Sequence, residues 1–406
     1  MDLILKNARL RDRDAAVDIG LADGRIAALA PTLSADARVI DLGGRLAVPG
    51  LIETHIHLDK TCILDRCTIQ EGTVQEAIAQ TSAAKQKFTA EDVYARGQRT
   101  LERCILQGTT RMRTHVELDP GIKLVGFEAI QALARDYAWA IDVEICVFPQ
   151  EGLLNRPGTD ELLVEGLKRG ARTIGATPYA DTDPRGHIDR VFEIAKAFDV
   201  DIDMHLDLAE VPDGMQIEYV CDKTEEYKYG GRVAVGHANQ LSVISPDRFE
   251  AIARRLADVG VAVTVLPATD LFLTGRRQEH SLLRGVAPVH KLVERGVTCS
   301  LSTNNVLNPF TPYGDGSLIR MANLYANVCH VCTPAGFATC LDMVTAASAR
   351  LMRLDDYAIA VGNPADITVL DAPDAASAVS ELAVPLWGFK RGRPTFTRPL
   401  ATLHRP

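Results

Sequence analysis

An alternation of short apolar runs with amphipathic segments fills most of this 406-residue chain and restricts how it can fold. Eight apolar runs are predicted strands, which we expect to end near residues 57, 117, 150, 179, 207, 238, 269 and 304. The segments between them, such as residues 89–108 and 245–260, combine helical periodicity with capping residues. Eight strand–helix units over roughly 300 residues predict a (β/α)8 TIM barrel, an α/β fold whose catalytic groups lie at the C-terminal strand ends. The alternative is a doubly wound open sheet, but no G-x-G-x-x-G follows the first strand.

The two ends of the chain have a different rhythm. Residues 2–48 contain short alternating strands, with turn signals at Asp23-Gly24 and Gly43-Gly44. Residues 357–397 repeat this pattern, so we expect the two ends to meet in one small β-sandwich domain. The predicted boundaries give residues 1–48 and 357–406 to the sandwich and residues 49–356 to the barrel.

The composition narrows the classes of function. Apolar residues make up 47% and charged residues 24%, as in an ordinary globular protein. The 53 acidic residues outnumber the 44 basic ones, and without a Lys/Arg block this balance argues against nucleic-acid binding. The apolar runs are broken by charge and the first residues lack signal-peptide features, so we expect no membrane span and no secretion. Nine scattered cysteines suggest no disulfide framework, which favours the cytoplasm.

Five of the ten histidines fall at predicted strand ends. His55 and His57 form H-x-H at the end of the first barrel strand, where residues i and i+2 face the same side and can reach one metal ion. His115, His205 and His237 end the second, fifth and sixth strands. Any one of these could be a core histidine, but the set predicts a single pocket.

Several motifs resemble the amidohydrolase superfamily. H-I-H-L-D-K at 55–60 follows V-P-G-L-I-E, and G-N-P-A-D-I-T-V-L occupies 362–370. More narrowly, the chain resembles the cytosine deaminase branch, which includes N-alkylammelide amidohydrolases. The segments that carry this likeness are R-T-H-V-E-L-D at 113–119, V-F-P-Q-E-G-L-L at 147–154, D-I-D-M-H-L-D at 201–207 and N-N-V-L-N-P-F-T-P-Y-G-D-G at 304–316. The resemblance covers essentially the whole chain.

The resemblance implies a TIM barrel with a β-sandwich from both termini and one divalent metal ion, Zn or Fe. In that branch the strand-one pair and the strand-five histidine bind the metal, which corresponds to His55, His57 and His205. His237 would face the hydrolytic water and the substrate. Members are commonly homo-oligomers, so we expect a homo-oligomer here.

The resemblance also implies substrate contacts. Gln150 would read the amide-like edge of a heterocycle, because one carboxamide offers both a donor and an acceptor. Phe310 would stack on a planar ring, with core packing as the alternative. His115 would line the same pocket. The expected partner is therefore a small heterocyclic substrate.

Two positions depart from the pattern of that branch. A typical member ends strand eight with an Asp that contacts the metal and takes a proton from water, whereas this chain has Asn304, which cannot act as a carboxylate base. Cytosine deaminases have a Glu that passes a proton to the ring, where this chain has Leu208. We therefore expect a substrate other than cytosine, and the apolar Leu208 suits one bearing an alkyl or aryl group.

The remaining residues can still support hydrolysis. Three neutral imidazoles leave the charge of a divalent ion uncompensated, and such a site can bring bound water to a pKa near 7. A proton carrier is then needed, and His237 is the first choice because histidine changes charge near neutral pH. Asp207 and Lys60 are second choices, and Lys60 is alternatively a ligand for a carbonyl or carboxylate.

Two hypotheses about function follow. The first is a metal-dependent amidohydrolase that cleaves a non-peptide C–N bond of a planar heterocyclic or urea-like molecule, by deamination, dealkylamination or ring opening. The alternative is a catalytically altered or inactive ligand-binding relative, suggested by Leu208 and Asn304. We favour the hydrolase because the histidine set and Gln150 are all present.

Overall fold

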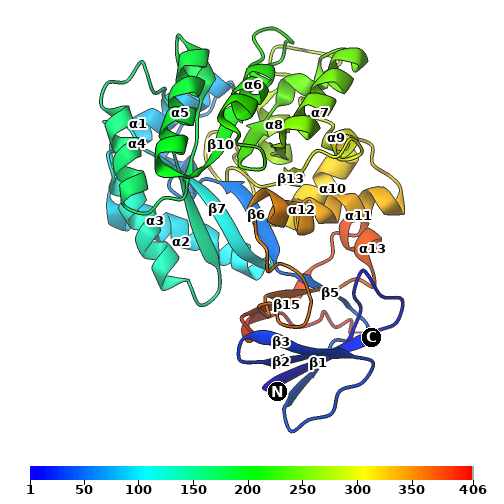
Figure 1. The fold of residues 1–406 in the computed structure, drawn as a ribbon. Coiled ribbons are helices and arrows are strands. Elements are labelled where there is room, and N and C mark those ends of the chain that lie inside the picture. Colours follow the sequence, from blue (N-terminus) through cyan, green and yellow to red (C-terminus); the bar gives the residue numbers. More distant parts are fainter. Residues whose placement is uncertain (405–406) are drawn as a thin grey trace.

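The computed structural model describes residues 1–404, and a parallel barrel stands on a smaller β domain (Figure 1). Neighbouring strands of the barrel follow one another in chain order and are parallel. The strands are β6 (Leu51–Ile56), β7 (Thr109–Glu117), β8 (Asp142–Phe148), β9 (Thr173–Ile174), β10 (Asp201–Leu206), β11 (Val233–His237), β12 (Val261–Val265) and β13 (Cys299–Leu301).

The barrel closes between its first and last strands. A parallel bridge pairs Ile56 with Asn304, just beyond β13. There the His57 N–H donates to the Asn304 carbonyl and the Asn304 N–H donates to the His55 carbonyl, both at 2.9 Å. This closure confirms the TIM barrel and excludes the doubly wound open sheet.

Two of the expected strand ends were wrong, and a proline explains the first. The strand expected to end near residue 269 stops at Val265, because Pro267 begins a helix and has no N–H to donate to a sheet. The strand expected to end near residue 179 is only Thr173–Ile174, and Pro178 begins a short 3-10 helix after it.

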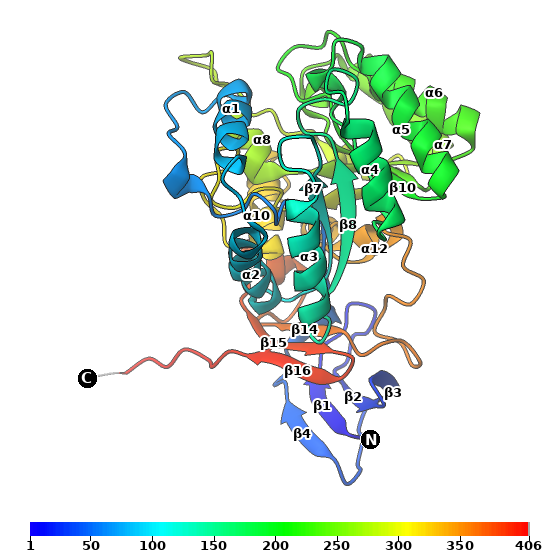
Figure 2. The ribbon, with the colours of Figure 1, turned by 90° about the vertical axis from the view of Figure 1, so that its left-hand side faces the viewer.

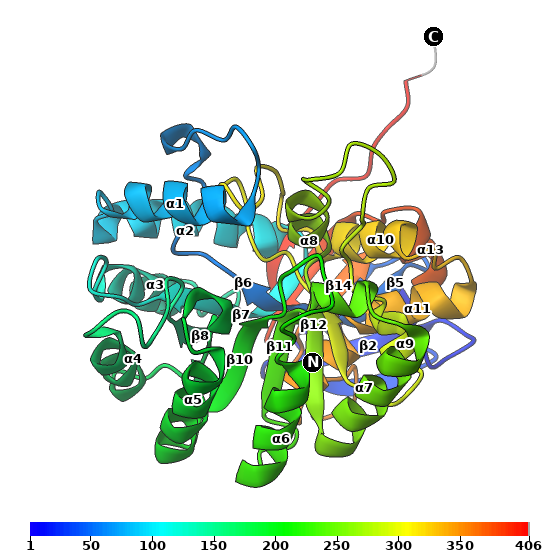
Figure 3. The ribbon, with the colours of Figure 1, turned by 90° about the horizontal axis from the view of Figure 1, so that it is seen from above.

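Helices surround the strands when the barrel is viewed from above (Figure 3). The predicted caps are present: the Thr89 side chain accepts the N–H of Asp92, the Ser245 side chain accepts that of Arg248, and Gly260 ends its helix at φ 73. The helices are α1 (Val74–Lys85), α2 (Ala90–Leu106), α3 (Val125–Asp136), α4 (Thr159–Lys168), α5 (Pro184–Phe198), α6 (Ile217–Tyr227), α7 (Pro246–Val259), α8 (Pro267–Leu273), α9 (Val289–Val293), α10 (Leu318–Val328), α11 (Pro334–Asp342), α12 (Ala346–Leu351) and α13 (Ala375–Ser380). Within residues 1–404, no helix combines the length and the apolar character that crossing a membrane requires.

Two four-stranded sheets form the small domain (Figure 2). Leu5, Ile19, Ile367 and Phe389, which come from both ends of the chain, are buried in one apolar cluster. This confirms the sandwich built from both termini, whereas the exact boundaries near residues 48 and 356 stay predictions. The first sheet has the order β3 (Arg25–Ala30), β2 (Val17–Ala22), β1 (Leu3–Ala8), β4 (Arg38–Asp41), and the second β16 (Arg393–Thr397), β15 (Pro385–Lys390), β14 (Ile367–Leu370), β5 (Leu46–Pro49).

Helix α1 is attached to the C-terminal end of the barrel by a buried ion cluster. The Lys85 ammonium lies 2.5 Å from carboxylate oxygens of both Glu117 and Asp119 and also contacts Glu151. Lys85 is only 3% exposed, so one buried ammonium serves three carboxylates away from water. A small apolar cluster then joins α1 to α8, and we call it the roof; its buried members are Ala77, Leu273 and Phe310.

Replacing Lys85 with Met should destabilise the protein by about 3–5 kcal/mol, because the buried carboxylates of Glu117 and Asp119 would lose the cation between them. Urea denaturation measures the free energy of unfolding. Lys87→Met is the matched control, since Lys87 is exposed and lies two residues after Lys85, just beyond the end of α1. A loss no larger than that of the control would contradict the role of the ion cluster.

Candidate active site

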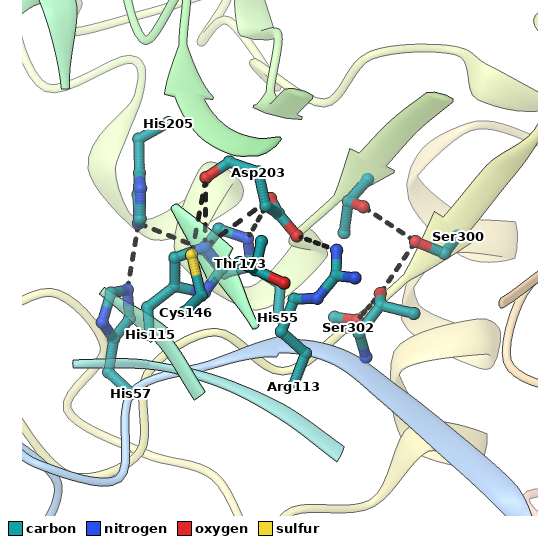
Figure 4. Close-up of polar contacts among 12 residues, drawn as sticks. His55, His57, Arg113, His115, Cys146, Thr173, Asp203, His205, Ser300 and Ser302 are labelled. Atoms are coloured by element: carbon teal, nitrogen blue, oxygen red, sulfur yellow. Dashed lines mark hydrogen bonds and ion pairs between the residues drawn. The ribbon is translucent and has the colours of Figure 1, made fainter. Parts of the chain in front are cut away.

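Three imidazole nitrogens converge at the C-terminal end of the barrel (Figure 4). The Nε2 atom of His205 lies 3.1 Å from that of His55 and 3.0 Å from that of His57. Nitrogens bound tetrahedrally to one Zn²⁺ lie roughly 3.3 Å apart, given Zn–N bonds of about 2.0–2.1 Å. The three side chains are at most 3% exposed, so the spacing and the donor set fit a single divalent ion.

Burial keeps these histidines neutral. It lowers the pKa of His55 to about 3, and that of His57 and His205 to well below the usual value, with further lowering from neighbouring positive groups. A neutral imidazole is the form that binds a metal, so these residues need not lose a proton before binding one.

Asp203 lies behind the histidines, and sequence reasoning missed it. One carboxylate oxygen is 3.5 Å from His55 Nδ1 and 3.6 Å from His115 Nε2, and the other accepts from Arg113 at 2.9 Å (Figure 4). Burial would raise the pKa of Asp203, but the two histidines hold it well below its usual range. Such a carboxylate orients a metal-binding imidazole and increases its basicity.

His115 supports His55. Its ring stacks on that of His55 with 3.8 Å between centroids, and its Nε2 faces Asp203. His115 is fully buried. The structure therefore places this predicted substrate contact behind the metal-facing histidines.

His237 is paired with Asp270, which sequence reasoning also missed. The His237 Nδ1 lies 2.6 Å from a carboxylate oxygen of Asp270, whose other oxygen accepts the N–H of Leu266. The His237 ring is 5.5 Å from that of His205, between centroids. Because Asp270 occupies Nδ1, the nitrogen left for proton exchange is Nε2.

The two departures from the family pattern lie close to the histidines in the chain. Asn304 is buried at φ 60, and its side-chain oxygen has no hydrogen-bond partner among residues 1–404. Leu208 is half-buried in the loop that follows β10. Neither residue can carry a proton.

Asp207 holds the start of α6. Its two carboxylate oxygens accept the N–H groups of Gln216 at 2.8 Å and Ile217 at 3.1 Å. Burial raises the pKa of Asp207 to about 6. Because both oxygens are engaged with backbone, the geometry gives this second-choice proton carrier a structural role.

Lys60 and Gln150 form a buried polar pair. The Lys60 ammonium donates to the Gln150 carbonyl oxygen at 2.6 Å and lies over the rings of Phe148, at 5.1 Å, and Phe310, at 4.7 Å. Phe148 in turn stacks on His205, with 4.9 Å between centroids. Lys60 and His205 therefore both contact the ring of Phe148. Phe310 also belongs to the roof.

Comparisons with known proteins agree with this architecture. The profile of the Amidohydrolase family matches residues 38–136 and 127–386. The N-isopropylammelide isopropyl amidohydrolase of Pseudomonas sp. (strain ADP) is 26% identical over 402 residues, which cover 97% of this chain and 96% of that protein.

Two solved structures are also similar over nearly the whole chain. The 5-methylcytosine deaminase of Klebsiella pneumoniae, liganded with 5-fluorocytosine, superposes with a TM-score of 0.95 at 28% identity and covers 99% of each chain. The N-isopropylammelide isopropylaminohydrolase of Burkholderia multivorans reaches a TM-score of 0.85 at 28% identity, covering 97% of this chain and 98% of that one.

These findings confirm the predicted resemblance to the cytosine deaminase-like branch and the prediction of a hydrolase that acts on C–N bonds. A profile match over most of the sequence, together with a shared barrel and sandwich, means that this chain belongs to the Amidohydrolase family.

Proposed function

We propose that one divalent ion, Zn or Fe, is held by His55, His57 and His205, and that the enzyme hydrolyses an exocyclic or ring C–N bond of a planar heterocycle. The observation that carries this proposal is the convergence of three neutral imidazoles beside the His237–Asp270 pair. When bound there, the ion supplies the positive charge that lets water ionise near neutral pH and polarises the carbon under attack.

His237 is the proton carrier in this proposal. Its Nε2 accepts the proton of the attacking water and returns it to the nitrogen that leaves, while Asp270 holds the proton on Nδ1 and stabilises the charged ring. The new bond joins water oxygen to carbon, and the broken C–N bond releases ammonia or an amine if the nitrogen is exocyclic, or opens the ring if it is a ring atom. Asp203 keeps the His55 ring in its orientation through the reaction.

The substrate is proposed to be a heterocycle other than cytosine. Leu208 gives the loop after β10 an apolar side chain where a carboxylate would deliver a proton to a ring, and Asn304 offers no base. Two of the similar proteins are named for hydrolysis of N-isopropylammelide, a heterocycle with an alkylamino group. Removal of ammonia or a small amine from such a ring fits both observations.

The decisive test is a screen of amino- and alkylamino-substituted azines with metal-loaded protein, reading release of ammonia or amine. Turnover of any of them supports the hydrolase and excludes an inactive ligand-binding relative. Absence of turnover with one ion bound per chain would favour that relative.

Location in the cytoplasm and assembly into a homo-oligomer stay predictions. Sedimentation of the purified protein tests the oligomeric state.

Adding Zn²⁺ to metal-free protein should raise its melting temperature, because an ion that binds only the folded state stabilises it by about 2.7 kcal/mol at a hundred times the Kd. His205→Ala should abolish most of this shift. His280→Ala, at an exposed loop position, is the matched control and should keep it. Calorimetry measures the shift, and equal stabilisation of His205→Ala and wild type would contradict the assigned site.

His237→Asn should lower kcat by about 10²- to 10⁴-fold, the usual contribution of a general acid–base group. Asn tolerates the left-handed backbone at this position, where φ is 71. Metal content should be unchanged because His237 is not among the three ligands. Steady-state kinetics with metal analysis checks both, and an unchanged kcat would remove His237 from the mechanism.

Asn304→Asp should not raise kcat/KM on the best substrate found, because the proton carrier is His237 and the pocket operates without a carboxylate at this position. Asp also tolerates the φ of 60. The comparison uses equal metal occupancy in both proteins. A rise of tenfold or more would instead identify Asn304 as a lost catalytic residue.

A further inference from the structure

The Lys60 ammonium is buried without a carboxylate in direct contact. Lys60 is 1% exposed, and no carboxylate oxygen of residues 1–404 lies within 4.0 Å of it. Its one hydrogen bond goes to the neutral Gln150 side chain, which leaves two of the three ammonium hydrogens without a partner there. A buried cation costs free energy unless it is paired, so this arrangement indicates a ligand that completes it.

Aromatic contacts offset only part of that cost. The rings of Phe148 and Phe310 lie 5.1 and 4.7 Å from the ammonium, within the range of cation–π attraction, which is about 0.5–2 kcal/mol. Burial lowers the pKa of Lys60, although the more distant Glu117 and Asp59 favour its charged form. The nearby carboxylate Glu117 is itself paired with Lys85.

The contact with Lys60 also settles which way the Gln150 amide faces. An ammonium can only donate, so the atom at 2.6 Å must be the carbonyl oxygen of Gln150. The remaining end is the NH2 group, which can only donate, and the amide lies beside the Tyr179 hydroxyl. Gln150 therefore does not present the mixed donor–acceptor edge that the sequence predicts.

We infer that Lys60 and Gln150 together bind an anionic substrate edge composed of acceptors, such as the oxo groups and deprotonated nitrogen of an ionised oxo-azine ring. This inference rests on the proposed function and specifies its substrate class. A neutral edge that alternates N–H and C=O would place its own donor against donors, which leaves that group unsatisfied. Charge-assisted hydrogen bonds to an anion satisfy both the ammonium and the amide.

The position of the pair agrees with one ring reaching both sites. The Lys60 ammonium lies 5.1 Å from the centroid of the Phe148 ring, and the His205 ring stacks on the same residue with 4.9 Å between centroids. Phe310, held in the roof by α1 and α8, covers the ammonium. A single planar ring can therefore offer its acceptor edge to Lys60 while its scissile bond lies near the histidines.

Binding of unreactive ring compounds tests the inference without turnover. Calorimetry on the metal-loaded protein at neutral pH compares barbiturate, an anionic oxo-pyrimidine, with uracil, a neutral ring of similar size. We expect barbiturate to bind at least tenfold more tightly than uracil. Orotate, a uracil with a carboxylate substituent, distinguishes the source of the charge: binding tighter than barbiturate would assign the anion to a substituent instead of the ring.

Two variants assign the preference to the pair. Lys60→Met should reduce the barbiturate preference to less than threefold, whereas Lys87→Met, at an exposed position, should keep it. Gln150→Glu should reduce it as much as Lys60→Met, since the new carboxylate neutralises the ammonium in place. A preference that survives both substitutions comes from the metal ion and overturns the inference, as does equal binding of uracil and barbiturate by wild type. If only the hydrolysis screen fails, the proposed function is contradicted, whereas the binding preference for an anionic ring still supports this inference.

Discussion

Two backbone hydrogen bonds between β6 and Asn304 close the barrel, and the site depends on that closure. They place His55 and His57 beside the segment after β13. Glu53 reinforces the junction, since its buried carboxylate accepts the N–H groups of Thr303 and His55 and also contacts the Thr303 hydroxyl. Burial raises the pKa of Glu53 to about 7. Because β6 is also paired with β7, the closure holds the segment that carries His55 and His57 from both sides, opposite His205.

A chain of charged pairs continues below the site. The Asp203 carboxylate faces two imidazoles, but Arg113 takes up its charge at 2.9 Å. Arg113 is in turn bound to Glu144 at 2.7 Å, so the pairs continue towards the N-terminal end of the barrel. Asp203 can therefore orient the rings of His55 and His115 while its own charge is paired with Arg113.

Features that repeat along the chain could be predicted from the sequence, whereas contacts across the barrel could not. Strand periodicity and the H-x-H spacing of His55 and His57 locate the barrel and its functional end, because i and i+2 share a face. Asp203 and Asp270 escaped notice, since each acts through a histidine on another strand and neither forms a local motif. Asp207 was instead predicted to transfer a proton because it lies near a metal-facing histidine in the sequence. In the structure its carboxylate oxygens accept backbone N–H groups. The strand predicted to end near residue 269 is shorter because Pro267 begins a helix there.

The two missing carboxylates and the buried lysine have one electrostatic consequence. A pocket with an acidic residue at position 304 or 208 would offset the charge of a bound divalent ion, but Asn304 and Leu208 offset none of it. Lys60 adds a further positive charge, 5.1 Å from the centroid of Phe148, the ring that stacks on His205. In a medium of low dielectric such an excess of positive charge is costly unless the ligand brings negative charge. An anionic ring would restore the balance on binding, so the same substitutions that disfavour cytosine favour an ionised heterocycle.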